Sequence, residues 1–181
     1  SAASDVYKRQ EFAMEIEEVE VAELTRNILI DWIPVFEDKQ IEYNIDIPEQ
    51  PFRVKLDADS YMRILNNLIQ NVLAHSQADR IGIIMQKQSG TVQILLEDNG
   101  IGIGKDDLKY IFDRFYKCDK GRSEKGSGLG LSIAQSLTQL QGGTFKLYLD
   151  GDLFKVCLSF PQKISPTALS APEDPHSEAH S

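Results

Sequence analysis

Two asparagines one helical turn apart are the first residues whose types and spacing could do chemistry. Asn67 and Asn71 lie in a stretch with helical apolar periodicity, so both amides project from one face of the predicted helix. Two amide oxygens placed in this way could bind a hard cation such as Mg²⁺, with water and phosphate oxygens completing its shell. The alternative is a solvated polar face, because Arg63, Asn66 and Gln70 are polar as well. On this pair alone, the solvated face is the better interpretation.

An acidic residue at the end of a predicted strand could recognise a nucleobase. The segment DNGIGIG begins at Asp98 and follows the alternating stretch from Val92 to Leu96. A carboxylate fixed there can accept a hydrogen bond from an exocyclic amine, which adenine has and guanine lacks at the matching position. The glycines would let the backbone approach a flat base. The same Asp-Asn-Gly sequence is also simply a good turn.

A third segment, GSGLGL from Gly126 to Leu131, comes directly before a predicted helix. Glycines that free backbone N–H groups at a helix N-terminus are typical of phosphate sites, although a flexible hinge fits equally well. A dinucleotide-binding motif is excluded because no leading strand or βαβ unit precedes the glycines. A Walker loop is excluded because no Gly-Lys-Ser or Gly-Lys-Thr follows.

The elements that must position these segments alternate between helical and strand periodicity. Pro34 is expected to kink or end the first helix, and Asp57 to Ser60 supply cap candidates for the second. The predicted elements are a helix over 24–36, strands over 41–47 and 52–56, a helix from about Asp59, strands over 81–85 and 92–96, a short helix over 106–112, a helix over 131–140 and a hairpin over 145–160. This order predicts an α+β fold, a two-layer α/β sandwich in which helices cover one face of a mostly antiparallel mixed sheet.

Composition narrows the classes of protein. The chain has 181 residues, is 41% hydrophobic and carries a formal net charge of −9, which indicates a globular domain and argues against nucleic-acid binding by charge alone. An anionic ligand would then need local cations, backbone dipoles or a metal. Cys118 and Cys157 form no metal or redox motif, which indicates a reduced, cytoplasmic setting. We therefore expect no signal peptide, and no apolar run in this sequence approaches the roughly 20 residues of a membrane span.

Both ends of the chain differ from its middle. Residues 1–10 lack apolar periodicity, and DVYKRQ from Asp5 to Gln10 matches one reading frame of a common transposon end, so we interpret it as translated sequencing adapter. The native protein is then expected to continue upstream. Residues 163–181 hold three of the seven prolines and predict a disordered tail, which leaves 11–162 as the domain.

The order of the motifs resembles one protein family. The Asn-bearing helix, DNGIGIG, IFDRFYK and GSGLGLSIAQ follow one another as in the ATP-binding catalytic domain of two-component sensor histidine kinases. The resemblance covers about residues 16–160. That domain shares its fold, the Bergerat-type ATP-binding fold, with the ATPases of gyrase, heat-shock chaperones and the MutL mismatch-repair proteins. The resemblance therefore implies a protein histidine kinase that uses ATP and Mg²⁺.

The resemblance also implies roles for single residues. Asn71, together with Asn67, would hold Mg²⁺ and the phosphates, and Asp98 would read the adenine amino group. Gly100 and Gly102 would shape the base pocket. The nucleotide-binding residues that it implies are Asn67, Asn71, His75, Asp98, Gly100, Gly102, Ile103, Phe115, Lys117, Gly126, Gly128, Leu129, Gly130 and Leu131.

The resemblance also implies roles for residues between Phe112 and Leu131. Phe112 and Phe115 would anchor the start of a nucleotide lid, and Lys117 would reach the γ-phosphate. The backbone from Gly128 to Leu131 would cradle the phosphates. The stretch from Lys117 to Gly126 has mixed charge and no apolar anchor, so we expect it to form a lid that orders over bound nucleotide.

Two positions depart from the family pattern. Ala74 stands where relatives often have a lysine that contacts phosphate, and His75 stands where an aromatic residue is common. His75 is either a structural residue at a helix end or a residue that stacks on or hydrogen-bonds the nucleotide. These departures bear on nucleotide affinity rather than on the binding mode.

The phosphoacceptor is not expected within the chain. The three histidines, His75, His176 and His180, lack the His-Glu…Pro context of family acceptors, so no catalytic acceptor residue is assigned. The acceptor is expected on an upstream helical dimerisation domain, and the further partner is a response-regulator receiver domain. We expect the domain itself to be monomeric and cytoplasmic, within a homodimeric parent that can be membrane-anchored.

Two rival functions remain open. An ATP-hydrolysing relative of the same fold would carry a glutamate four residues before the second asparagine, where it activates water, and this position is Asn67, which cannot act as a base. A non-catalytic nucleotide-sensing module is compatible with Ala74.

Overall fold

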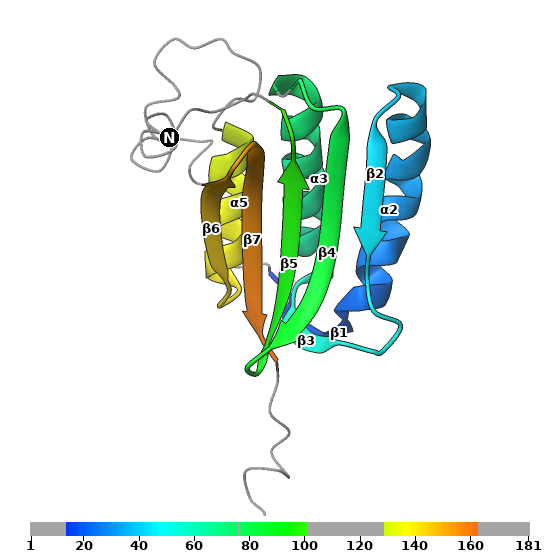
Figure 1. The fold of residues 1–181 in the computed structure, drawn as a ribbon. Helices are drawn as coiled ribbons and strands as arrows, with labels where there is room; N and C mark the ends of the chain where they lie inside the picture. Colours follow the sequence, from blue (N-terminus) through cyan, green and yellow to red (C-terminus); the bar gives the residue numbers. More distant parts are fainter. Residues whose placement is uncertain (1–13, 76, 101–128, 163–181) are drawn as a thin grey trace, which may run out of the picture.

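The computed structural model describes residues 14–75, 77–100 and 129–162, so the expected leader and tail lie outside the described residues. Figure 1 shows the arrangement of the elements. In chain order they are β1 (Glu17–Glu20), α2 (Val21–Asp38), β2 (Glu42–Asp46), β3 (Arg53–Leu56), α3 (Ala58–His75), β4 (Arg80–Gln88), β5 (Thr91–Asp98), α5 (Leu129–Leu140), β6 (Thr144–Asp150) and β7 (Leu153–Pro161).

A five-stranded mixed sheet forms one layer of the molecule. Its strand order is β2-β4-β5-β7-β6, with β2 parallel to β4 and all other neighbours antiparallel. The β4–β5 hairpin turns at Ser89 and Gly90, which have φ values of 50° and 77°, and the β6–β7 hairpin turns at Gly151, with a φ of 61°. These left-handed conformations favour glycine and match the twist of two-residue hairpins. The predicted hairpin over 145–160 is therefore confirmed, and the two strands predicted over 81–85 and 92–96 form a second hairpin.

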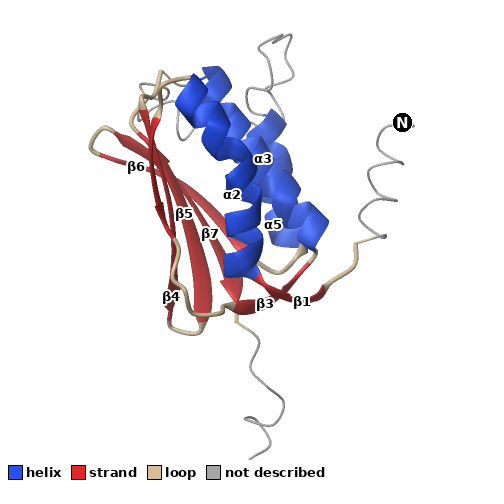
Figure 2. Cartoon of the chain, turned by 90° about the vertical axis from the view of Figure 1, so that its right-hand side faces the viewer, coloured by secondary structure: helices blue, strands red, loops and turns tan. Residues whose placement is uncertain are grey.

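The helices α2, α3 and α5 cover one face of this sheet, as Figure 2 shows. Alternate residues of β5 and β7 are buried, because one face of each strand packs against the helices and the other faces away from them. Ile64, Leu65 and Ile69 of α3 are fully buried in the same core. The expected two-layer α/β sandwich, with a mostly antiparallel mixed sheet, is confirmed.

A small second sheet lies at one end of the sandwich. It pairs β1 with β3 in antiparallel register, from Glu17 opposite Leu56 to Glu20 opposite Arg53. The Glu20 carboxylate caps α2 by accepting from the Glu23 backbone N–H at 2.6 Å, and it also accepts from the Phe52 N–H at 2.6 Å. The sequence analysis missed β1 because three of its four residues are glutamates, which are depleted in strands.

Helix α2 does not end at Pro34. It continues to Asp38, because Phe36 is fully buried and stacks on Trp32 with ring centroids 6.3 Å apart. A proline removes the hydrogen bond to the carbonyl four residues earlier, which here belongs to Ile30. Both Pro34 and Ile30 are exposed, so water can hydrogen-bond that carbonyl. Burial of Phe36 therefore outweighs the local preference of proline.

Helix α3 begins at a buried carboxylate. Asp57 is 8% exposed, and its Oδ1 accepts from the Ser60 backbone N–H at 2.7 Å, which is the geometry of an N-cap. Its Oδ2 accepts from the Glu15 N–H at 2.7 Å, and its own N–H donates to Gln141 Oε1 at 2.7 Å. Asp57 thus joins the segment before β1, the start of α3 and the residue that follows α5.

We predict that Asp57→Ala lowers the free energy of unfolding by roughly 2 kcal/mol, because it removes both a helix cap and a hydrogen bond to a second segment. Urea unfolding followed by circular dichroism measures this change. Asp59→Ala is the matched control, since Asp59 is exposed in the same first turn and contributes only through the helix dipole, by about 0.5 kcal/mol. Equal losses in the two variants would contradict the role of Asp57.

Candidate nucleotide-binding site

The end of α3 and the end of β5 lie at the same edge of the main sheet. Helix α3 ends at His75, and residues 76–79 join it directly to β4. The second residue of β4, Ile81, pairs with Asp98, the last residue of β5. On its other side, Asp98 pairs with Phe154 near the start of β7. Connectivity and register therefore bring the predicted cation and base contacts to one end of the fold (Figure 1).

The start of α5 comes to the same end. Helix α5 leads into β6, which runs back to Asp150, and Asp150 pairs with Leu153 beside the strand partner of Asp98. Helix α5 also packs along α3. A methyl group added at Gly130 would lie 3.8 Å from the backbone oxygen of Asn67. The first turn of α5, whose backbone N–H groups have no partners within the helix itself, thus lies next to the asparagine-bearing part of α3.

The polar residues of α3 do not form a single solvated face. Arg63 and Gln70 are exposed, whereas Asn66 accepts a hydrogen bond from Trp32 Nε1 on α2 at 2.8 Å. Asn67 and Asn71 are half-buried. Each group of polar residues thus has a different environment, and the solvated-face interpretation does not describe the asparagine pair.

Asn67 carries an unusual buried amide. Its Nδ2 is buried and has no hydrogen-bond partner among the residues that the structure describes. A buried donor without a partner costs about 1–3 kcal/mol, so such a group is expected where a ligand supplies the acceptor. Phosphate oxygens are suitable acceptors, and amide oxygens are ligands that Mg²⁺ accepts. The chemistry of Asn67 and Asn71 therefore fits a magnesium–phosphate group.

A metal ion at this site would take much of its coordination from the phosphates of a bound nucleotide. Within residues 14–75, 77–100 and 129–162, no three or more His, Cys, Asp or Glu side chains are grouped so that they could hold a metal ion. The amides of α3 are neutral and half-buried. A cation held there would draw its negative ligands from phosphate oxygens, as is usual for Mg²⁺ bound with a nucleotide.

Asp98 presents a fixed carboxylate at the end of β5. The residue is 3% exposed, and its Oδ1 accepts from the Gly100 backbone N–H at 2.9 Å. This turn-type hydrogen bond orients the carboxylate before any ligand arrives. A buried, oriented acceptor is what recognition of an exocyclic amine requires.

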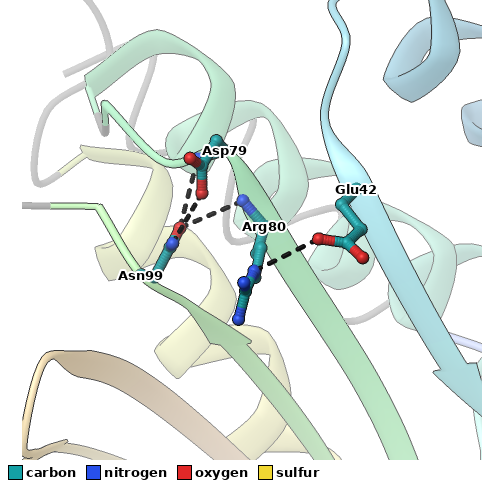
Figure 3. Close-up of polar contacts among 4 residues, drawn as sticks. All are labelled: Glu42, Asp79, Arg80 and Asn99. Carbon is teal, nitrogen blue, oxygen red and sulfur yellow. Dashed lines mark hydrogen bonds and ion pairs between the residues drawn. The ribbon is translucent and has the colours of Figure 1, made fainter.

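Asn99, the residue after Asp98, makes a contact that the sequence analysis did not predict. Its Oδ1 accepts from the backbone N–H groups of Asp79 at 3.1 Å and Arg80 at 3.0 Å, and its Nδ2 donates to Asp79 Oδ1 at 2.6 Å. Figure 3 shows this cluster, together with the ion pair between Arg80 Nε and Glu42 Oε2 at 3.2 Å. For Asn99 itself, the Asp-Asn-Gly sequence indicated only a place in a turn, and the partner residues lie too far away in the sequence to be recognised from it.

Lys155, on the strand next to Asp98, does not project from the same face of the sheet as Asp98. Lys155 is opposite Glu97, one position before Asp98, so it projects from the other face of the sheet. Its Nζ contacts Asp150 Oδ2 at 2.9 Å and Glu97 Oε2 at 3.4 Å. The hydrogen bond to Asp150 is the main reason that the pKa of Lys155 is raised. Lys155 therefore stabilises the sheet rather than a bound phosphate.

Several predicted residues can be placed only in part. The side chain of Leu131 is buried, so only its backbone could contact a phosphate, while Ala74 is exposed near the end of α3. His75 and Leu129 lie in α3 and α5, and the structure describes no more of them than their backbone. The predicted residues outside the described part of the chain are Gly102, Ile103, Phe112, Phe115, Lys117, Gly126 and Gly128, together with the short helix over 106–112 and the lid over 117–126.

The described helices give no sign of a membrane span. None of those in the ranges above combines the length and the apolar character needed to cross a bilayer.

Comparison with known proteins gives relatives of one kind. The chain is 34% identical over 122 residues to the sensor histidine kinase WalK of Bacillus subtilis, and the aligned region covers 65% of this chain and 20% of WalK. It is 34% identical over 148 residues to the sensor-like histidine kinase SenX3 of Mycolicibacterium smegmatis, and this aligned region covers 80% of the chain and 36% of SenX3. The chain therefore spans between 20% and 36% of the length of these curated relatives.

The fold has solved counterparts. The catalytic domain of the histidine kinase ThkA superposes with a TM-score of 0.70 at 22% identity, over 82% of this chain and 97% of that domain. Residues 56–164, more than half of the chain, match the family of histidine kinase-, DNA gyrase B- and HSP90-like ATPases. This chain therefore belongs to that family, as an ATP-binding catalytic domain of the sensor histidine kinase type.

Proposed function

We propose that this domain binds Mg-ATP and presents the γ-phosphate to a histidine on an upstream dimerisation domain. The observation that carries the proposal is the convergence of three groups at one end of the sheet. These groups are the half-buried amides of Asn67 and Asn71, the buried carboxylate of Asp98 and the first turn of α5. Together they offer a contact for each part of a magnesium-bound adenine nucleotide.

The base would be read by Asp98. A buried carboxylate accepts hydrogen bonds only, so it would pair with the adenine amino group, whereas the guanine carbonyl at the same position would set a second acceptor against it. Its hydrogen bond to the Gly100 N–H orients one oxygen and supports selection of ATP over GTP.

The phosphates and Mg²⁺ would be held by α3 and α5. The Asn71 and Asn67 amides would supply a metal ligand and a phosphate donor, and the N-terminal end of α5 would add backbone N–H groups and the positive end of the helix dipole. With a net charge of −9, the chain must meet an anionic ligand by such local groups rather than by its overall field.

The transfer itself requires little covalent chemistry from this domain. A nitrogen of the acceptor imidazole forms the new bond to the γ-phosphorus, the bond to the β,γ-bridging oxygen breaks, and ADP leaves. Positioning and charge neutralisation supply most of the catalysis. Hydrolysis is disfavoured because Asn67 stands where a water-activating carboxylate would be needed. The phosphoryl group would then pass to a response-regulator receiver domain, the second proposed partner.

The proposal is tested with the chain joined to the acceptor domain encoded upstream in its own gene. With ATP labelled on the γ-phosphate, we expect an acid-labile label on the acceptor histidine that is lost in Asn71→Ala. The chain alone should neither label itself nor release phosphate at more than a trace rate. Rapid phosphate release by the chain alone would instead favour the hydrolase function, and nucleotide binding without transfer would favour the sensing function.

We predict that Asp98→Asn weakens ATP binding by tenfold or more, about 1.5–3 kcal/mol, because an amide can turn a donor toward the adenine amino group. Isothermal calorimetry measures the affinity. Asp59→Asn is the matched control, because it makes the same chemical change at the far end of α3 and should leave the affinity unchanged. Unchanged affinity in Asp98→Asn would remove the adenine contact from the proposal.

A further prediction concerns Ala74, which stands where relatives often have a lysine. Ala74 is exposed on α3 and follows Asn67 and Asn71 along the same helical stripe, so a lysine there could reach the phosphates. We expect Ala74→Lys to tighten ATP binding about fivefold, roughly 1 kcal/mol, after allowance for solvent exposure.

The control for this variant separates a contact from a general charge effect. Gln88→Lys adds the same charge at the opposite end of β4, where it should change the affinity little. Equal gains in the two variants would mean that the lysine acts through net charge alone. No gain at low salt in a folded Ala74→Lys would mean that position 74 does not face the phosphates.

A further inference from the structure

Asn99 fastens two segments that the proposed nucleotide would span. Backbone pairing between β4 and β5 ends at Ile81 and Asp98, and beyond this pair the Asn99 side chain takes over. Its amide oxygen accepts from the N–H groups of Asp79 and Arg80, and its amide nitrogen donates to the Asp79 carboxylate at 2.6 Å. Both the oxygen and the nitrogen of the Asn99 amide therefore hydrogen-bond residues of the segment that connects α3 to β4.

The same connection is held from its other side by β2. The Glu42 backbone N–H donates to the backbone carbonyl oxygen of Asp79 at 2.8 Å, and Arg80 forms an ion pair with the Glu42 side chain. The Arg80 and Glu42 side chains are 71% and 75% exposed, so water and salt weaken this pair. Beyond the last β4–β5 pair, the three hydrogen bonds of Asn99 join this connection to the end of β5.

We propose that Asn99 is a positioning residue that sets the distance between the Mg-phosphate end of the site and the adenine contact. On one side it is bonded through the chain to Asp98, and on the other it holds Asp79 and Arg80, which lie between the end of α3 and the body of β4. This inference rests on the proposed function, because both contacts belong to the proposed nucleotide site. Asn99 itself need not touch the nucleotide.

The chain offers a matched exchange of polar groups for the test. Asn99→Asp keeps an acceptor for both backbone N–H groups but sets a carboxylate against Asp79, where donor and acceptor are 2.6 Å apart in the wild type. Asp79→Asn alone leaves the Asn99 donor facing an amide oxygen. The double variant Asn99→Asp with Asp79→Asn restores a donor opposite an acceptor and has the net charge of the wild type. Asn99→Ala removes all three hydrogen bonds without a change in charge.

The measurement is the ratio of ATP affinity with Mg²⁺ to ATP affinity in EDTA, taken by calorimetry at a temperature where circular dichroism shows each variant to be folded. We expect the ratio to fall about three- to tenfold in Asn99→Asp and Asn99→Ala, and to recover in the double variant. Asp79→Asn should stay near the wild type. The melting temperature is recorded in parallel, because a purely structural role would lower it without changing the ratio.

The outcomes separate this inference from the proposed function. If the wild type binds no Mg-ATP, the proposed function fails, and the inference fails with it. If the wild type binds and the ratio is unchanged in the single variants, the inference is overturned while the function stands. A lowered ratio that the double variant does not recover also overturns it, because the effect would then not come from the contact with Asp79.

Discussion

The pairing of β5 with both β4 and β7 is the constraint on which the rest of the structure depends. All eight residues of β5, from Thr91 to Asp98, have partners on both sides. The β7 partner comes from the far end of the chain and brings α5 and β6 with it. This register places Asp98 between Ile81 and Phe154 and, through the connections of those strands, brings the end of α3 and the start of α5 to the same edge.

The chemistry gathered at that edge relies on orientation more than on charge. The described groups are two amides, a carboxylate fixed by its own turn and the end of a helix, in a chain with a net charge of −9. Such groups do little for a free phosphate in water. They gain strength where the fold holds them and limits the access of water, so the attachment of each segment matters as much as its residue types.

Much of this arrangement could be predicted because β5, β6 and β7 alternate between buried and more exposed residues. β7 alternates buried and half-buried residues along almost its whole length, and a period of two is the clearest strand signal. β1 was missed, and α2 does not end at Pro34, because long-range packing, of β1 on β3 and of Phe36 in the core, overrides local preference. Asn99 could not be recognised because its partners, Asp79 and Arg80, meet it only once β4 and β5 have paired.

The small β1–β3 sheet determines how far a tethered domain must reach. Val54 of β3 lies opposite Val19 and also bridges to Gln162, so the chain enters and leaves the domain side by side. The Gln162 backbone N–H donates to the backbone oxygen of Gly90, just before β5, whereas Asp98 lies at the other end of that strand, roughly 26 Å away at 3.3 Å per residue. A neighbouring domain joined at either point starts a full strand length from the nucleotide edge. An acceptor histidine close to that junction would need a linker of at least about eight extended residues to reach the nucleotide edge of the same domain.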